Sequence, residues 1–493
     1  MTTPKIKRDM GKAAALRPLR EVDHWDRAAD VVVVGLGAAG CCAAIEAAEA
    51  GLDVLALERM SGGGGTSALS TGQLYIGGGT PIQKACGFED TPEEMYKYLM
   101  ATCGPGEDEA KIRMYCDHSV GHFDWLAGHG IPFKESYYGD GSYTPTDDCL
   151  SYSGSEQSYP YRDIAKPAPR GHTVRQDGIE AGAQLMRSLI EAIGTTTTEV
   201  QEDSLVQTLV VDENRRVVGC VVRRDGGEQM VGARRGVILC AGGFINNREM
   251  VHHYAPELWR CRYRAASDGD DGRGIRMGMG AGGAAKRMET GCIVLPFTVP
   301  KKLMNGVMVN QRGLRFINED LYQTTVGEAA LLHQDGHVYL ICDNKCFERP
   351  FAPTEIAAVE ESIADLEGSL NMPAGVLQST VAQFNEHAAR GEDPIFHKSA
   401  AYLAPLDTPP YAALDFRVEN SLYTVFTMGG LHTLPSAQVL SPDGDVIPGL
   451  YAAGRTTSGL AAQGYSSGLS LADGTFFGRM AGRHVAGLTV PPS

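Results

Sequence analysis

The chain has 493 residues, of which 43% are hydrophobic and 21% charged, an ordinary composition for a globular protein. This length exceeds what a single hydrophobic core usually holds, so more than one domain is expected. The formal net charge of −16 argues against sequence-independent binding of nucleic acid, because such binding needs a positively charged face.

The N-terminal part of the sequence carries no sign of a secretory leader. Residues 1–30 are polar, and no apolar segment of the kind found in signal peptides precedes residue 31,. The apolar stretch 31–57 contains glycines and the acids Glu46 and Glu49, which we expect to face water. We therefore interpret it as folded structure and not as a membrane span. The sequence predicts a cytoplasmic protein without a transmembrane segment.

A strand, a helix and a second strand are predicted within residues 30–59, which read DVVVVGLGAAGCCAAIEAAEAGLDVLALER. The four valines at 31–34 are typical of a buried parallel strand. The alanine-rich segment 41–50 predicts a helix, and residues 53–57 predict the second strand. This arrangement is a βαβ unit, the part of an α/β fold that binds nucleotides.

Three glycines and one acid in this unit fit a bound dinucleotide. Gly35, Gly37 and Gly40 follow the pattern G-x-G-x-x-G. The first glycine permits a tight turn, the second lets the backbone approach a pyrophosphate, and the third lets the helix pack close to the strand. The unpaired N–H groups at the start of the helix then face the phosphates. Glu58 ends the second strand, where an acid accepts hydrogen bonds from ribose hydroxyls.

A second match to the glycine pattern is interpreted differently. Gly278, Gly280 and Gly283 have the same spacing, but the preceding residues 268–276 are polar and glycine-rich and do not resemble a strand. We interpret this match as a helix end followed by a loop. One dinucleotide site is therefore predicted.

Other elements are predicted in chain order. The glycine-dense segment 60–80 suits a loop that lies against a flat ligand,. Residues 139–170 are predicted to form a long irregular excursion that could line an active site. Helices are expected at 91–100, with Thr91 as N-cap, and at 107–128 and 178–193. Strands are expected at 199–212, 216–224 and 236–244.

The composition changes at about residue 288, which predicts an inserted domain. We expect a nucleotide-binding domain formed by 1–287 and 421–493 and an inserted substrate domain at 288–420. The insert should contain a strand at 337–342 and helices up to Ala388. The returning chain should contain strands within 424–430 and 438–454 and a final helix within 464–482.

The twelve cysteines are scattered, and no C-x-x-C occurs. Neither a zinc ribbon nor a thioredoxin-type redox pair is indicated, and no metal site is predicted. Flavin disulfide reductases need a redox cysteine pair soon after the first βαβ unit, but residues 60–85 contain no cysteine. Reduced and mostly buried thiols are expected.

The βαβ unit, the segment NQRGLRFINED at 310–320 and the segment GLYAAG at 449–454 together resemble the fumarate reductase/succinate dehydrogenase flavoprotein family. The resemblance covers nearly the whole chain. It implies an α/β fold with a Rossmann-like FAD-binding domain and an inserted α+β cap, which is the substrate domain. The cofactor-binding residues that it implies are Gly35, Gly37, Ala38, Ala39, Gly40, Glu58, Arg59, Gly65, Thr66, Ser67, Gly72, Ala241, Gly242, Gly454, Gly468, Leu469, Ser470 and Leu471.

The chain departs from parts of that family at three places. Membrane-bound members carry a histidine that bonds covalently to FAD in the loop corresponding to 61–80, which here has no histidine, so non-covalent FAD is expected. Phe426 stands where dicarboxylate reductases have a histidine before T-M-G-G. The segment GYSSGLSLA has Tyr465 and Ser467 where those reductases have a substrate arginine. A carboxylate is best held by arginine, whereas a tyrosine and a serine suit a neutral carbonyl.

Within the family, the Y-S-S-G ending, the loop GGTSALSTGQLYIGGGT and the tyrosine of NEDLY are most similar to the delta-4-(5-alpha) 3-ketosteroid dehydrogenases. This resemblance implies that Tyr322, Tyr465 and Ser467 are catalytic. It also implies dehydrogenation of a 3-keto-5-alpha-steroid to the 4-ene-3-keto steroid, with the hydride from C5 going to flavin N5. The C4 proton would go to a relay of these hydroxyls, with a backbone N–H near Leu469 assisting at the C3 carbonyl.

Such a site must polarise the carbonyl with hydrogen-bond donors and accept a proton through a positioned oxygen. Since phenol has a pKa of about 10, the rate is expected to rise toward alkaline pH. The expected partners are a small apolar keto substrate and an external electron acceptor such as a quinone. Three alternatives remain: a delta-1 3-ketosteroid dehydrogenase, a fumarate-reductase-like reductase of an unsaturated acid that would use Arg312 or Arg315, and a flavin-binding protein without enzyme activity.

Overall fold

The centre of the larger lobe is a nine-stranded sheet in which the predicted valine strand is an inner member. The computed structural model describes residues 15–141, 145–178 and 180–489. Strand β2 (Arg27–Val34) pairs in parallel with β3 (Val54–Leu57) on one side and with β10 (Gly227–Leu239) on the other. Residues 31–33 have no exposed surface, as expected for a parallel strand covered on both faces.

The order of this sheet is β1-β8-β9-β10-β2-β3-β7, and β21 joins it by pairing with β10 and with β20. The predicted strand at 199–212 is two strands in the structure, because β7 pairs with β3 while β8 pairs with β9. The remaining strands are β1 (Arg17–Pro18), β7 (Glu199–Gln201), β8 (Leu205–Val211), β9 (Val217–Arg224), β20 (Gln438–Leu440) and β21 (Val446–Ala452).

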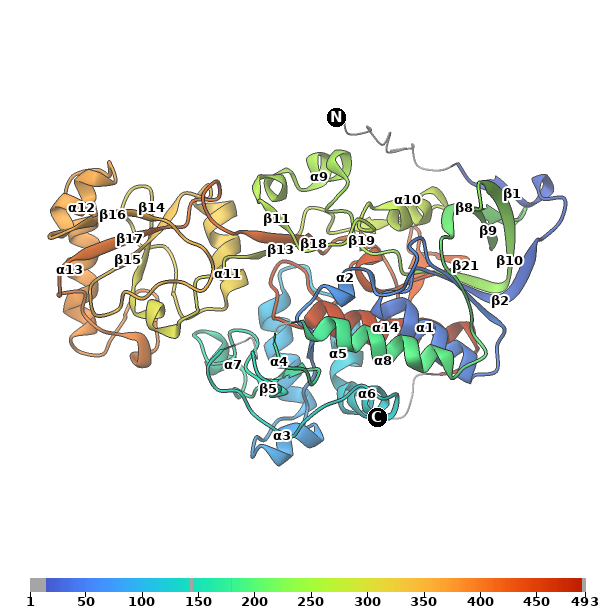
Figure 1. Ribbon diagram of the computed structural model, residues 1–493, viewed down its shortest axis with the longest axis horizontal. Helices are drawn as coiled ribbons and strands as arrows, with labels where there is room; N and C mark the ends of the chain where they lie inside the picture. The colour runs from blue at the N-terminus through green and yellow to red at the C-terminus, as the bar shows by residue number, and fades with distance from the viewer. Residues whose placement is uncertain (1–14, 142–144, 179, 490–493) are drawn as a thin grey trace.

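Helices α1 (Ala38–Glu49), α8 (Ala181–Gly194) and α14 (Leu469–Val485) lie side by side in this lobe (Figure 1). Helix α1 packs closely on α14, since a Cβ atom at Gly478 would stand 2.3 Å from the carbonyl oxygen of Ala39. This packing shows that the expectation for Glu46 is wrong. Glu46 is 6% exposed and pairs with Arg479 at 3.1 Å and with Arg483 at 2.5 Å. The neighbouring acid of the prediction, Glu49, is exposed as expected.

The predicted helices of this lobe are present in the structure, but one of them is divided into two. Helix α4 (Pro92–Cys103) begins after Thr91, whose side chain accepts a hydrogen bond from the N–H of Glu94 at 3.2 Å. The predicted helix at 107–128 is two helices that meet at His118. These two are α5 (Glu109–Asp117) and α6 (Ser119–Gly128), and the other short elements of this region are α2 (Gly65–Ala68), α3 (Pro81–Ala85), α7 (Tyr161–Ile164), β4 (Gln73–Tyr75), β5 (Leu150–Ser151) and β6 (Gly171–Thr173).

The second G-x-G-x-x-G match is confirmed as a helix end and loop. Helix α10 (Arg273–Gly280) contains the first two of its glycines, and Gly283 follows in the loop. A Cβ atom at Gly278 would stand 2.3 Å from Leu431. Gly278 therefore lets α10 pack closely against β19 (Gly430–Leu431).

The smaller lobe, which we call the cap, has its own sheet (Figure 1, left). The sheet has the order β14-β15-β17-β16, and all four strands lie within the segment 288–420 that was expected as an insert. The strands and helices of the cap are β14 (Val307–Asn310), β15 (Val338–Cys342), β16 (Ile356–Glu360), β17 (Tyr411–Asp415), α11 (Gln323–Glu328), α12 (Ile363–Ser369) and α13 (Val376–Ala388).

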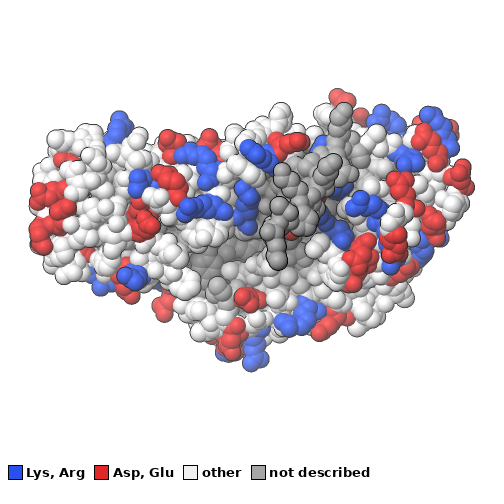
Figure 2. Space-filling model, turned by 45° about the horizontal axis from the view of Figure 1, so that its top comes forward, with Lys and Arg blue, Asp and Glu red and all other residues white. Residues whose placement is uncertain are grey.

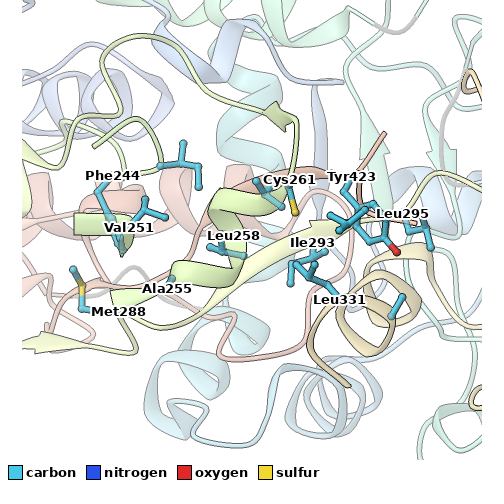
Figure 3. Close-up of a cluster of buried hydrophobic side chains, with 14 of the residues drawn as sticks. Phe244, Val251, Ala255, Leu258, Cys261, Met288, Ile293, Leu295, Leu331 and Tyr423 are labelled. Atoms are coloured by element: carbon cyan, nitrogen blue, oxygen red, sulfur yellow. The ribbon is translucent and has the colours of Figure 1, made fainter. Parts of the chain in front are cut away.

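The chain passes between the two lobes through a three-stranded sheet, which we call the hinge sheet. Its order is β11 (Tyr263–Arg264), β18 (Thr424–Thr427) and β13 (Gly291–Val294). Figure 3 shows buried side chains that continue the hydrophobic core along this passage, from Val251 of α9 (Arg248–Tyr254) through Ile293 of β13 to Leu331 of the cap. Within the described ranges, no helix is long and apolar enough to cross a bilayer.

The cysteine prediction is confirmed. All twelve cysteines are free, and each is buried except Cys86, which is partly exposed.

Candidate active site

A cavity of about 730 Å³ runs from the β2–α1 turn to the hinge sheet, within the usual range of ligand pockets. Most of the residues predicted to bind a cofactor or to act in catalysis line it. These are Gly35, Gly37, Ala38, Ala39, Glu58, Arg59, Gly65, Thr66, Ser67, Ala241, Gly242, Gly454, Gly468, Ser470 and Leu471, together with Tyr322, Tyr465 and Ser467.

The three glycines of the first motif differ in their surroundings. Gly35 has φ +97°, and a Cβ atom there would stand 2.5 Å from the carbonyl oxygen of Cys240. A Cβ atom at Gly40 would stand 1.9 Å from the carbonyl oxygen of Gly35, so Gly40 lets the helix approach the strand. At Gly37 the nearest atom would be Oγ of Ser67, at an ordinary 3.5 Å. Gly37 therefore borders open space inside the cavity.

Glu58 ends β3 and holds the glycine turn in place. Its two carboxylate oxygens accept hydrogen bonds from the N–H groups of Leu36 at 2.8 Å and Met60 at 3.0 Å. Each carboxylate oxygen can accept a further hydrogen bond, so the carboxylate can also receive a ribose hydroxyl. The neighbouring Arg59 pairs with Asp271 at 2.8 Å, which fixes a loop on the opposite wall.

Asp270 connects three segments of the cavity wall, and sequence analysis missed it. It is 2% exposed and accepts hydrogen bonds from the N–H of Gly243 at 2.8 Å, from the hydroxyl of Thr66 at 2.8 Å and from Arg455 at 2.5 Å. A second nitrogen of Arg455, Nη1, is buried and has no acceptor among the described residues. Because buried N–H groups are normally paired, this nitrogen is suited to a ligand that brings an acceptor atom.

The three predicted catalytic residues, Tyr322, Tyr465 and Ser467, all line the cavity. Tyr322 immediately precedes α11, and Tyr465 and Ser467 precede α14. The carbonyl oxygen of Tyr465 accepts a hydrogen bond from the hydroxyl of Thr324 at 2.8 Å. Its phenol oxygen accepts one from the N–H of Ser470 at 3.3 Å. The phenol of Tyr465 is thus anchored at the start of α14 and still has its own proton to donate.

The surroundings of Tyr465 affect its ionisation. Its ring meets the ring of Phe426 edge-on, with centroids 5.5 Å apart. Burial raises the pKa of Tyr465 well above the ordinary value for a phenol, because an apolar environment disfavours the charged form. Tyr465 is therefore neutral at physiological pH and can act as a hydrogen-bond donor.

The irregular excursion that follows residue 139 positions this group, a role that sequence analysis did not assign to any of its residues. The carbonyl of Ser153 accepts a hydrogen bond from the N–H of Ser467 at 2.8 Å. The hydroxyl of Ser155 accepts one from the N–H of Tyr322 at 2.9 Å. Ser155 is held in turn, since its N–H donates to the hydroxyl of Tyr98 at 2.8 Å. The excursion thereby fixes the backbone of two of the predicted catalytic residues.

Three predicted cofactor residues lie outside the cavity wall. Gly40 is the packing glycine of the first motif, and Gly72 packs against Ala181, because a Cβ atom there would stand 2.3 Å from the carbonyl carbon of Ala181. Leu469 is fully buried, and its N–H donates to the carbonyl of Ser466 at 3.1 Å. The N–H of Leu469 itself is therefore occupied, and the predicted help of a backbone N–H near Leu469 at a substrate carbonyl stays a prediction.

The wall beside Tyr465 is largely apolar and comes from the hinge sheet, which sequence analysis did not anticipate. Its residues are Cys292, Val294, Pro296, Leu422, Thr424 and Phe426. In the described part of the chain, each arginine that lines the cavity has an aspartate partner: Arg59 and Arg273 pair with Asp271, and Arg455 pairs with Asp270. This end of the cavity suits an apolar ligand with a neutral polar group.

The arginine expected to serve a reductase of an unsaturated acid does not reach this site. Arg315 is buried in the cap, where it pairs with Glu319 at 2.7 Å and Asp393 at 2.8 Å. Neither Arg312 nor Arg315 lines the cavity. The ion pairs of Arg315 therefore serve the fold of the cap.

Residues 30–470 match the family model described as "FAD binding domain". The chain belongs to this family. The resemblance drawn from the motifs is thereby confirmed, and FAD is the cofactor that the family membership assigns to the cavity. The residues present fit this group. Gly37, just before α1, borders open space, the carboxylate of Glu58 could accept a ribose hydroxyl, and Nη1 of Arg455 has no acceptor among the described residues.

Several known proteins are similar to this chain. A 3-oxo-5-alpha-steroid 4-dehydrogenase of Comamonas testosteroni is 29% identical over 87% of this chain and 93% of its own. A solved structure is also similar: the crystal structure of a 3-ketosteroid-delta4-(5alpha)-dehydrogenase from Rhodococcus jostii RHA1 in complex with 4-androstene-3,17-dione. Its sequence is 44% identical to this chain, the TM-score is 0.92, and the match covers 96% of this chain and 99% of that one. A flavocytochrome c3 fumarate reductase in its open conformation is 26% identical with a TM-score of 0.65, covering 94% of this chain and 79% of that one.

Proposed function

We propose that this protein is an FAD-dependent dehydrogenase that converts a 3-keto-5-alpha-steroid to the 4-ene-3-keto steroid. The observation that carries the proposal is the group of three hydroxyl residues, Tyr322, Tyr465 and Ser467, in a cavity whose wall beside Tyr465 is largely apolar. A neutral carbonyl on an apolar skeleton matches this part of the cavity. The similarity to the Rhodococcus and Comamonas enzymes supports this substrate class.

The reaction needs a group that polarises the C3 carbonyl, because C4 becomes acidic only as the carbonyl oxygen takes up negative charge. Tyr465 is suited to this role, since its phenol is neutral and its oxygen is held by the N–H of Ser470. Such a positioned donor contributes about 3 to 4 kcal/mol to stabilising an oxyanion. Bound FAD supplies the acceptor for the hydride that leaves C5.

The C4 proton needs a hydroxyl that can pass it on. Tyr322 and Ser467 line the same cavity as Tyr465, and the excursion holds the backbone of both through Ser155 and Ser153. An alcohol is a weak base by itself, so a relay that releases the proton outward is required. In this assignment Tyr322 and Ser467 form the relay with Tyr465. An external acceptor such as a quinone takes up the electrons at the end of the cycle.

Anaerobic titration tests the substrate class. A 3-keto-5-alpha-steroid is expected to bleach the flavin absorbance stoichiometrically and to yield a product lighter by two hydrogens, with a double bond between C4 and C5. Fumarate, offered with a reduced dye as donor, is expected to turn over negligibly because the lining arginines are already paired with acids,.

The products separate the alternatives. A double bond between C1 and C2 would establish the delta-1 reading, and fumarate turnover comparable to that of a steroid would establish a dicarboxylate reductase. A flavin that responds to none of these compounds would point to a flavin-binding protein without this activity.

FAD is expected to be bound without a covalent link. The loop 61–80 contains no histidine, and its members that line the cavity are glycine, serine, threonine, alanine, leucine and glutamine residues. Precipitation with acid should therefore leave the yellow colour in the supernatant, with the absorbance and mass of intact FAD. Colour that stays in the washed pellet would contradict this expectation.

A further inference from the structure

A second cleft, of about 880 Å³, adjoins the active-site cavity where the cap meets the hinge sheet. The side chain of Leu422 belongs to the walls of both. We infer that this cleft binds a negatively charged group at the end of the steroid's C17 side chain. This inference rests on the proposed function and specifies the substrate class.

The orientation of the substrate follows from the position of the hydroxyls. The C3 carbonyl lies at one end of a rigid skeleton and C17 at the other, so a steroid with C3 at Tyr465 must point C17 away from it. Phe426 touches Tyr465, and Thr424 lies about 7 Å further along β18 at the usual rise of a strand,. Leu422 follows just beyond β18 in that direction. The C17 substituent therefore leaves the cavity at Leu422, which is where the second cleft begins.

The hinge sheet contributes residues to the walls of both the active-site cavity and the second cleft. Tyr263 of β11 is the register partner of Thr424 of β18. Thr424 lines the active-site cavity, and Tyr263, half exposed, lines the second cleft. Phe351, which is 76% exposed, stands in the same cleft wall. These aromatic side chains offer apolar contact to the aliphatic part of a steroid side chain.

The charges of the cleft favour an anion. Two arginines, Arg262 and Arg349, and one acid, Glu355, line it. Both arginines are exposed, and neither forms an ion pair with an acid in the described parts of the chain. Figure 2 shows Lys and Arg side chains gathered on the face between the cap and the larger lobe. A free guanidinium suits a carboxylate or a phosphate.

The test compares three 3-keto-5-alpha-steroids: one with a carboxylate at the end of its C17 side chain, the uncharged methyl ester of that compound, and one without a side chain. The carboxylate is expected to have the highest kcat/KM at low salt. Arg262→Gln and Arg349→Gln should each lower kcat/KM for the carboxylate by about fivefold, as is typical of exposed ion pairs. The ester should be unaffected. Added salt should weaken the preference for the carboxylate, because exposed charges are screened.

Arg264→Gln is the matched control. Arg264 lies on the same strand as the cleft residue Tyr263, but it stacks on the ring of Trp259 at 3.7 Å and does not line the cleft. This variant should keep the preference for the carboxylate. The coenzyme A thioester of the same acid distinguishes two sources of the anion: a further gain in kcat/KM assigns the arginines to phosphates of a carrier, and equal or lower values assign them to the side-chain carboxylate.

Equal kcat/KM for the carboxylate and the ester would overturn this inference and leave the proposed function intact. An equal loss for both compounds in the two arginine variants would overturn it as well, because it would show a structural effect and not recognition of charge. Flavin that is not reduced by any 3-keto steroid would overturn the proposed function, and with it this inference.

Discussion

Replacing Tyr465 by phenylalanine is expected to slow flavin reduction by a 3-keto-5-alpha-steroid about 10²-fold or more. The change removes one oxygen atom and almost no volume. That oxygen is held by the N–H of Ser470, and Tyr465 lines the same cavity as Tyr322 and Ser467. Its loss takes away a donor to the C3 carbonyl at the moment when negative charge develops there.

Binding of FAD should survive this change, because it removes one hydroxyl and leaves the predicted cofactor-binding residues that line the cavity unaltered. Rapid mixing under anaerobic conditions measures flavin reduction, and the visible spectrum of the purified variant reports the FAD content. Tyr451→Phe is a matched control. Tyr451 is also buried, and its hydroxyl hydrogen-bonds to His484 at 3.2 Å, but it does not line the cavity.

The pH dependence of the wild-type enzyme gives a second readout. A phenol with an ordinary pKa would make the rate rise as pH approaches about 10. Burial raises the pKa of Tyr465, so Tyr465 stays protonated over a wider range and its ionisation moves to higher pH. We therefore expect no rise assignable to Tyr465 between pH 7 and about 9. A rate equal to the wild type in Tyr465→Phe would show that this tyrosine only packs against Phe426, and the substrate assignment would have to be withdrawn.

The sequence predicted those features of the site that are set by neighbouring residues. Four valines followed by Gly35, Gly37 and Gly40 define a strand, a turn and a helix within a short stretch of chain. The structure shows Gly35 in a turn with positive φ and Gly40 at the contact of helix and strand, and the role of Gly37 at a pyrophosphate stays a prediction. Tyr465 and Ser467 were located differently, through the resemblance of the Y-S-S-G segment to a family, and the structure places both just before α14, whose N-cap Gly468 has a left-handed conformation.

Features that depend on contacts between distant segments could not be predicted. Glu46 looked exposed in its own helix, and the arginines that bury it lie more than 400 positions away on α14. In the sequence, Asp270 is one acid in a glycine-rich stretch. Its hydrogen-bond partners Thr66, Gly243 and Arg455 come from other parts of the chain and are known only from the fold. No local sequence pattern indicates contacts between residues so far apart in the chain.

Replacing Gly37 by valine is expected to remove FAD from the protein without unfolding it. Gly37 has φ −79° and ψ −175°, an extended conformation that β-branched residues readily adopt. A Cβ atom there would meet no protein atom closer than 3.5 Å. The added methyl groups would instead occupy the space where the backbone must approach the pyrophosphate. Overpacking at such a contact costs about 3 kcal/mol, which lowers the affinity for FAD about 10²-fold.

The absorbance of the purified variant measures its FAD content, and circular dichroism measures its fold. Gly121→Val is the matched control, because Gly121 is exposed on α6 and its added Cβ atom would have no neighbour within 4 Å. The Gly37 variant should also unfold at a lower temperature than the wild type, and added FAD should no longer raise that temperature, since a ligand stabilises only the protein that binds it. A yellow Gly37→Val protein with wild-type FAD content would show that the pyrophosphate lies elsewhere. Loss of the folded spectrum would show that Gly37 is needed for packing, as Gly40 is.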